Sequence, residues 1–172
     1  MNCFCTGQEV ALLNLIWTLN LYLTGTIAEF WINMYDIERI TKIIEDIERY
    51  FKDLDYLNIK SKEDLKDRKN FYSLSMILFS ITNRTIDLGD EIVSANKLGM
   101  PSTYKDIFRL LCRNNIISRD LERKLSTLVF YRNLLSHEYY DLSEKDVFDV
   151  FIRISAVKEF LEIVKTLLRK NK

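Results

Sequence analysis

Residues 36–54, DIERITKIIEDIERYFKDL, carry the pattern that decides the fold class. Asp36 can cap the first turn of a helix, because its carboxylate accepts a hydrogen bond from a backbone N–H of that turn. The apolar side chains that follow recur every three or four positions, which is the spacing of one helix face. They are Ile37, Ile40, Ile44, Ile47, Phe51 and Leu54. The stretch therefore predicts an amphipathic helix that buries this face against other elements.

The residues downstream predict four further helices. A capping box at Ser61–Asp64 opens a second helix that ends near Leu98. The segment Gly99-Met100-Pro101 stops this helix, because Gly suits the position after a helix and Pro cannot continue one. The last three predicted helices are one capped at Thr103 and ending near Asn114, one from Ser118 to His137, and one that begins after Ser143 and continues through Leu168.

The composition agrees with a helical protein. The 172 residues include only 4 Gly and 1 Pro, which argues against an all-β architecture with its many tight turns. Hydrophobic residues at 48% and charged residues at 29% exclude a disordered chain. We therefore predict an all-α, antiparallel helical bundle of about five helices.

Residues 1–33 differ from the rest of the chain. They contain no Lys or Arg, and Glu9 and Glu29 are their only charged side chains. Met34 then opens the charge-rich helical region. The sequence thus predicts an N-terminal extension, residues 1–33, that is either genuine or a start-site artefact, followed by a helical-bundle domain, residues 34–172. We expect the domain not to need the extension.

Residues 10–28 are apolar enough to raise the alternative of a membrane-tethered protein. A secretory signal has a basic region before its apolar run, and a spanning helix has about 20 strongly apolar residues. This run has no basic flank, and Asn14, Asn20 and Gly25 interrupt it. We therefore expect no stable membrane association.

The cysteines favour a reducing compartment and no metal site. Cys3, Cys5 and Cys112 are odd in number and too few for a disulfide framework, so we expect a cytoplasmic protein. Cys3 and Cys5 would give two soft metal ligands, but His137 is the single histidine and no second cysteine pair completes a tetrahedral site. We expect neither a metal nor another cofactor.

A polar cluster marks the end of the fourth predicted helix: Arg132, Asn133, Ser136, His137 and Tyr139. Histidine acts as a general acid or base near neutral pH, and the arginine fork suits phosphate oxygens. These groups suit metal-independent cleavage of RNA, in which the imidazole activates a ribose 2′-hydroxyl and the guanidinium stabilises charge on the phosphoryl group.

The spacing of Arg132 and His137 restricts how they can act together. Five helical steps turn about 140°, so the two side chains do not stack on one helix face. Either the helix ends between them, or the site combines residues from two chains of a symmetric dimer. The 25 basic and 25 acidic residues cancel, so any RNA contact must be local. We expect Arg84 and Arg113 to be nearby basic side chains.

The segment RNLLSHEYY, residues 132–140, resembles the Arg-x4-His-x-Tyr motif of the HEPN superfamily, specifically the HepT-type toxins of HEPN–nucleotidyltransferase toxin–antitoxin pairs. The segment GMPSTYKDIF, residues 99–108, and the amphipathic C-terminal region agree, so the resemblance covers roughly residues 34–170. It implies a metal-independent endoribonuclease toxin of a type VII-like pair, acting at the cleft of a symmetric homodimer. Its nucleotidyltransferase (MNT) antitoxin would silence it by AMPylation of a tyrosine.

The resemblance also assigns roles to residues of the proposed nuclease site. Arg132 and His137 match the catalytic pair, and Asn133 matches the polar residue that follows the arginine and assists at the phosphate. Asp87 resembles an acidic position near the site and is a candidate accessory residue.

Tyr139 matches the tyrosine that receives AMP, and the neighbouring Tyr140 is the alternative acceptor. A second interpretation stays open, because HEPN domains include members that do not hydrolyse RNA. In this alternative the chain is a non-catalytic helical module that binds a nucleotidyltransferase or another protein.

Overall fold

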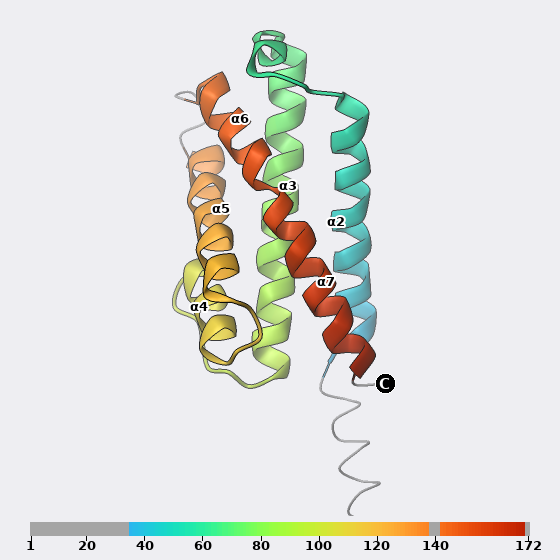
Figure 1. The fold of residues 1–172 in the computed structure, drawn as a ribbon, viewed down its shortest axis with the longest axis vertical. Coiled ribbons are helices and arrows are strands. Elements are labelled where there is room, and N and C mark those ends of the chain that lie inside the picture. The colour runs from blue at the N-terminus through green and yellow to red at the C-terminus, as the bar shows by residue number, and fades with distance from the viewer. Residues whose placement is uncertain (1–34, 138–141, 171–172) are drawn as a thin grey trace, which may run out of the picture. The chain divides into compact units, whose positions relative to one another are not determined.

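The computed structural model describes residues 35–137 and 142–170, and every regular element in these ranges is a helix (Figure 1). The elements are α2 (Ile37–Leu57), the 3-10 helix η1 (Lys62–Lys66), α3 (Arg68–Ala95), α4 (Tyr104–Arg113), α5 (Arg119–His137), α6 (Glu144–Arg153) and α7 (Ser155–Lys170). The predicted all-α class is therefore confirmed. No helix within these ranges is long and apolar enough to cross a membrane. The predicted extension, including residues 10–28 and the two N-terminal cysteines, lies outside the described residues.

Helix α2 runs antiparallel to α3 and packs along it (Figure 1). Asp36 caps α2 as predicted, since its Oδ1 accepts from the backbone N–H of Arg39 at 3.0 Å. The predicted apolar face of α2 is buried from Ile40 to Leu54, whereas Ile37 remains 40% exposed. The pattern of residues 36–54 thus predicted both the start of this helix and its buried face.

The capping box at Ser61 does not open the long second helix, so this boundary was predicted wrongly. Asp64 accepts from the backbone N–H groups of Lys60 and Ser61 at 2.8 and 2.9 Å, but the helix that follows is the short η1. Asp67 then adopts extended backbone and accepts from the N–H of Lys69 at 2.9 Å. Because an Asp side chain competes in this way with helical bonding, α3 begins after Asp67.

Helix α3 ends on a left-handed residue, but this residue is not the predicted glycine. Lys97 has φ 52°, and the N–H of Leu98 reaches back to the carbonyl of Val93 at 3.1 Å, which is the Schellman pattern. Gly99 lies two residues further on, with φ 114°, a backbone region that residues with side chains rarely adopt. The turn then leads to α4, which Thr103 caps as predicted.

The last predicted helix is two helices. The sequence predicts one helix from Ser143 to Leu168, and the Ser143 cap is present, but the helix breaks at Ile154, between α6 and α7. Helix α6 packs against η1, α3 and α5, whereas α7 crosses toward α2, where Lys165 pairs with Glu48 at 2.9 Å (Figure 1). Both halves pack against α5, but their other neighbours differ, and buried Ile154 lies at the change of direction.

Candidate active site

The site begins with α5, which carries core residues on one side and polar residues at its C-terminal end. Leu121, Leu125 and Leu128 are almost fully buried, as the sequence predicts. Arg132 follows Leu128 by one turn and is half-buried, and Asn133 beside it is exposed. The polar end of α5 therefore lies at the edge of the core.

A cleft of about 920 Å³ opens between α3, α5, the first turn of α4 and the segment that precedes it. Three of the predicted site residues, Asp87, Arg132 and Asn133, line it together. The other lining residues are Ile86, Asp90, Pro101, Ser102, Thr103, Tyr104, Lys105, Ile107 and Val129. The structure thus gathers residues that the sequence separates by more than 40 positions.

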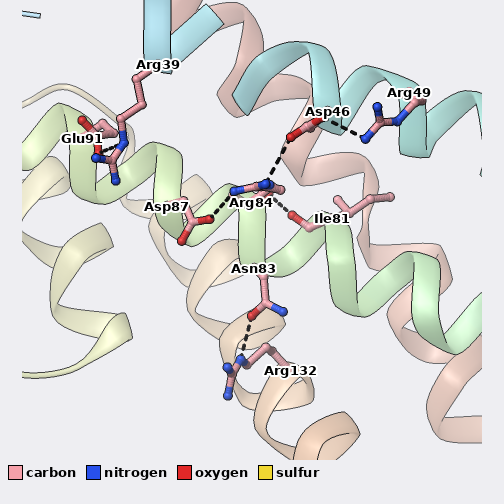
Figure 2. Close-up of polar contacts among 10 residues, drawn as sticks. Arg39, Asp46, Arg49, Ile81, Asn83, Arg84, Asp87, Glu91 and Arg132 are labelled. Atoms are coloured by element: carbon pink, nitrogen blue, oxygen red, sulfur yellow. Dashed lines mark hydrogen bonds and ion pairs between the residues drawn. The ribbon is translucent and has the colours of Figure 1, made fainter. Parts of the chain in front are cut away.

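Arg132 is held by side chains from two other helices. Its Nε donates to Oδ1 of Asn83 on α3 at 2.8 Å, and Figure 2 shows Asn83 directed toward it. Its guanidinium carbon lies 5.4 Å from the ring centre of Phe79 and 5.3 Å from that of Tyr104. A longer contact of 3.4 Å joins its Nη1 to Oδ1 of Asn133.

Arg84 has a different environment from Arg132, although it follows Asn83 directly. Its guanidinium pairs with Asp46 of α2 at 3.2 Å and with Asp87 at 3.1 Å, on the opposite side of α3 from Arg132 in Figure 2. Asp46 also accepts from Arg49 at 2.8 Å. Arg84 therefore joins α2 to α3, and it pairs with the cleft residue Asp87.

The cleft does not include Arg84 or Arg113, which the sequence predicts as nearby basic side chains. Neither is among its lining residues, and Arg113 is the exposed last residue of α4. The basic side chain that does line it with Arg132 is Lys105. The first turn of α4 therefore supplies a basic side chain to the cleft, which the sequence did not predict.

Helix α5 continues to His137, whose backbone forms the last residue of the helix. One of the two predicted options, a helix end between Arg132 and His137, is therefore wrong. The side chain of His137 and residues 138–141, including Tyr139 and Tyr140, lie outside the described residues. In the part of the chain that is described, no group of three or more His, Cys, Asp or Glu side chains is arranged to hold a metal ion.

The sequence interpretation missed Asn83, Asp90 and Tyr104. Asn83, Asp87 and Asp90 occur at helix spacing on α3, so a polar stripe along one face of that helix was the available signal. Tyr104 gave no such signal, because it is the first residue after an ordinary cap. Its contact with Arg132 depends on how α4 packs.

The cap of α4 forms part of the cleft wall. Thr103 accepts from the backbone N–H of Asp106 at 3.3 Å and donates its hydroxyl to the Asp106 carboxylate at 2.9 Å. The Thr103 hydroxyl, followed by the Arg109 guanidinium, lowers the pKa of the Asp106 carboxyl. The cap thus fixes the start of α4 beside the lining residues Tyr104 and Lys105.

Comparison with known proteins gives consistent family matches. A profile of the family described as Ribonuclease HepT-like matches residues 40–164. The mRNA nuclease HepT of Shewanella oneidensis is 31% identical over 81 residues, which span 46% of this chain and 61% of that nuclease. This alignment therefore covers less than two thirds of the relative.

Two solved structures share the fold. A chain in the crystal structure of a mutant MntA-HpeT toxin–antitoxin pair aligns with a TM-score of 0.67 and 26% identity, covering 74% of this chain and 98% of that one. A chain in the structure of the tri-AMPylated Shewanella oneidensis HEPN toxin with its MNT antitoxin aligns with a TM-score of 0.56 and 24% identity, covering 81% of this chain and 97% of that one. At 24% identity, the second structure shows only that the two chains share a fold.

Proposed function

This chain belongs to the family of HepT-like ribonucleases, and from that premise we propose that it is an endoribonuclease toxin that cleaves RNA without a metal. The observation that carries the proposal is the placement of Arg132 at the cleft, with Asn133 and Asp87 lining the same space. A guanidinium held by three neighbouring side chains is suited to bind a phosphate in a defined orientation.

Arg132 and His137 divide the chemistry between them. The His137 imidazole accepts the proton of a ribose 2′-hydroxyl, and the resulting 2′-oxygen forms a bond to phosphorus. The bond from phosphorus to the 5′-oxygen breaks, that oxygen takes up a proton from water, and His137 afterwards releases to water the proton that it accepted. Arg132 stabilises the charge that develops on the phosphoryl oxygens, and Asn133 donates to the same group.

The working site contains residues from two copies of the chain. Because α5 continues to His137, positions 132 and 137 lie about 140° apart around the axis of one helix. A symmetric homodimer brings equivalent surfaces together and can place the histidine of one protomer beside the arginine of the other. The homodimer is therefore part of the proposal.

The partner that silences the enzyme is a nucleotidyltransferase antitoxin, which transfers AMP to Tyr139. Support comes from the Arg-x4-His-x-Tyr spacing of residues 132–139 and from the toxin–antitoxin pair named in the similar structure. A bulky nucleotide two residues after His137 would block the approach of RNA. Co-production with a nucleotidyltransferase should add AMP, detected by mass spectrometry, and Tyr139→Phe should prevent it while Tyr140→Phe does not.

The nuclease activity is tested with the purified full chain and labelled RNA in EDTA. We expect cleavage by the wild type and by the control Arg123→Ala, an exposed change on the same helix, and loss of cleavage in Arg132→Ala and in His137→Ala. Mixing the two inactive variants should restore part of the activity, because a mixed dimer holds one intact pair. Cleavage by both variants alone would indicate a contaminating nuclease, and partner binding without any cleavage would favour the non-catalytic module.

A further inference from the structure

Asn83 contacts Arg132 at the nitrogen closest to the aliphatic chain of that arginine. Its Oδ1 accepts from Nε at 2.8 Å, and the two residues are 49 positions apart. The guanidinium group is planar, so a hydrogen bond at Nε fixes the orientation of the whole plane, including its two terminal nitrogens. Asn83 therefore determines how the arginine faces the cleft.

The aromatic rings beside Arg132 complete this arrangement. Phe79 lies one turn before Asn83 on α3, so the two side chains share a face of that helix. Tyr104 comes from α4, which approaches α3 closely at Gly89. The guanidinium is thus positioned by contacts from two helices, and the hydrogen bond that it donates to Asn83 is directional.

The acceptor at Nε is a neutral amide. A carboxylate at the same place would bind Nε more strongly, but it would add a negative charge close to where an RNA phosphate would lie. The neighbouring Arg84 shows the contrast, since it pairs with the carboxylates of Asp46 and Asp87 and joins helices. An amide orients the arginine without this repulsion.

We infer that Asn83 is a positioning residue of the nuclease site, which holds the Arg132 guanidinium in the orientation that stabilises the reacting phosphate. This inference rests on the proposed function. Misplacement of a charged group by about 1 Å can lower a rate about 100-fold. Asn83→Ala should therefore lower kcat by about 10- to 100-fold, with a smaller change in KM.

The kinetic test compares three variants of α3 in the full chain. Asn83→Ala removes the acceptor, Asn83→Asp keeps it but adds charge, and the control Ser80→Ala removes only a bond within α3, from Ser80 to the carbonyl of Met76. We expect the loss in kcat for the first, a raised KM that increases at low salt for the second, and wild-type kinetics for the third. Thermal unfolding of each variant separates these effects from loss of fold.

A double variant tests whether Asn83 acts through Arg132. Lysine lacks Nε, so in the Arg132→Lys background the further change Asn83→Ala should lower the residual cleavage by less than twofold. An independent effect of the same size as in the wild-type background would overturn the inference. So would unchanged kcat for Asn83→Ala in an enzyme that loses activity on Arg132→Ala.

A spectroscopic measurement separates failure of this inference from failure of the proposed function. In the ¹H–¹⁵N spectrum, the arginine Nε–H signal that disappears in Arg132→Lys should shift and exchange faster with water in Asn83→Ala but not in Ser80→Ala. An unchanged signal overturns the positioning contact, whatever the activity. Absence of RNA cleavage by the wild type overturns the proposed function and, with it, the catalytic purpose of a contact that the spectrum still detects.

Discussion

Gly89 of α3 and Ile107 of α4 approach so closely that a Cβ atom on Gly89 would lie 2.8 Å from Cγ2 of Ile107. The ring of Phe108 would lie 3.3 Å from that added Cβ atom. Cγ2 is attached directly to the branched Cβ of Ile107 and cannot swing aside as the tip of a longer side chain can. Glycine at this position therefore sets the distance between α3 and α4, and with it one wall of the cleft.

We expect Gly89→Ala to destabilise the protein. Forcing an extra methyl group into a packed core costs about 1–3 kcal/mol, and the better helix propensity of alanine offsets about 1 kcal/mol of this. Differential scanning calorimetry should show a lower Tm. The control Ser94→Ala, an exposed change on α3, should leave the Tm equal or higher. A Tm for Gly89→Ala at or above that of the wild type would contradict the close packing.

Thr103→Ala should remove the cap of α4 and destabilise the protein by about 1 kcal/mol. The hydroxyl both accepts from the backbone N–H of Asp106 and donates to its carboxylate. Thr103→Ser keeps these bonds and should restore most of the stability. Urea denaturation measures both variants, and equal midpoints for the alanine and serine variants would argue against the cap.

Arg84 should couple more strongly to Asp46 than Arg49 does. The Arg84 pair joins α2 to α3 and its arginine is 41% exposed, whereas the Arg49 pair lies within one helix and its arginine is 62% exposed. Exposed pairs within a helix contribute about 0.3–0.5 kcal/mol. Double-mutant cycles with Asp46→Ala should give a larger coupling energy for Arg84→Ala than for Arg49→Ala. The reverse order would show that the contact between helices is not the stronger one.

Asp64 should make stability depend on pH in the acid range. Hydrogen bonds from the backbone N–H groups of Lys60 and Ser61 lower the pKa of its carboxyl below the usual 3.8. A pKa lower in the folded state means that the stabilisation is complete above pH 3.8 and is lost as pH falls through the lower, folded pKa. Asp64→Asn should weaken this dependence, measured as denaturation midpoints from pH 5 down to about pH 2. An identical pH profile for wild type and variant would contradict a stabilising role of the hydrogen bonds that Asp64 accepts.

A chain that begins at Met34 should fold without residues 1–33. The described residues between positions 35 and 170 form one compact unit with its own buried core. Circular dichroism and the Tm of the shortened chain should match those of the full chain, and its RNA cleavage should be equal. Insoluble or unfolded protein would show that the domain needs its N-terminal segment.

Local patterns predicted the helices whose ends depend on neighbouring residues alone. Asp36, Thr103 and Ser143 each cap a helix as predicted, because a cap is a hydrogen bond across three residues. Part of the candidate site was also predictable from residues that are neighbours in the sequence. Arg132 and Asn133 lie within one short motif, so the sequence alone indicated them.

The sequence by itself determined the helical class, most of the caps, and the buried faces of α2 and α5, since all of these follow from spacing along the chain. Tertiary structure alone decided the break at Ile154, where one amphipathic pattern meets two sets of partners. It also decided that Asn83 and Tyr104 contact Arg132. Such contacts depend on the distance and register between helices. The packing at Gly89 sets these, and the periodicity of residues along the chain does not predict them.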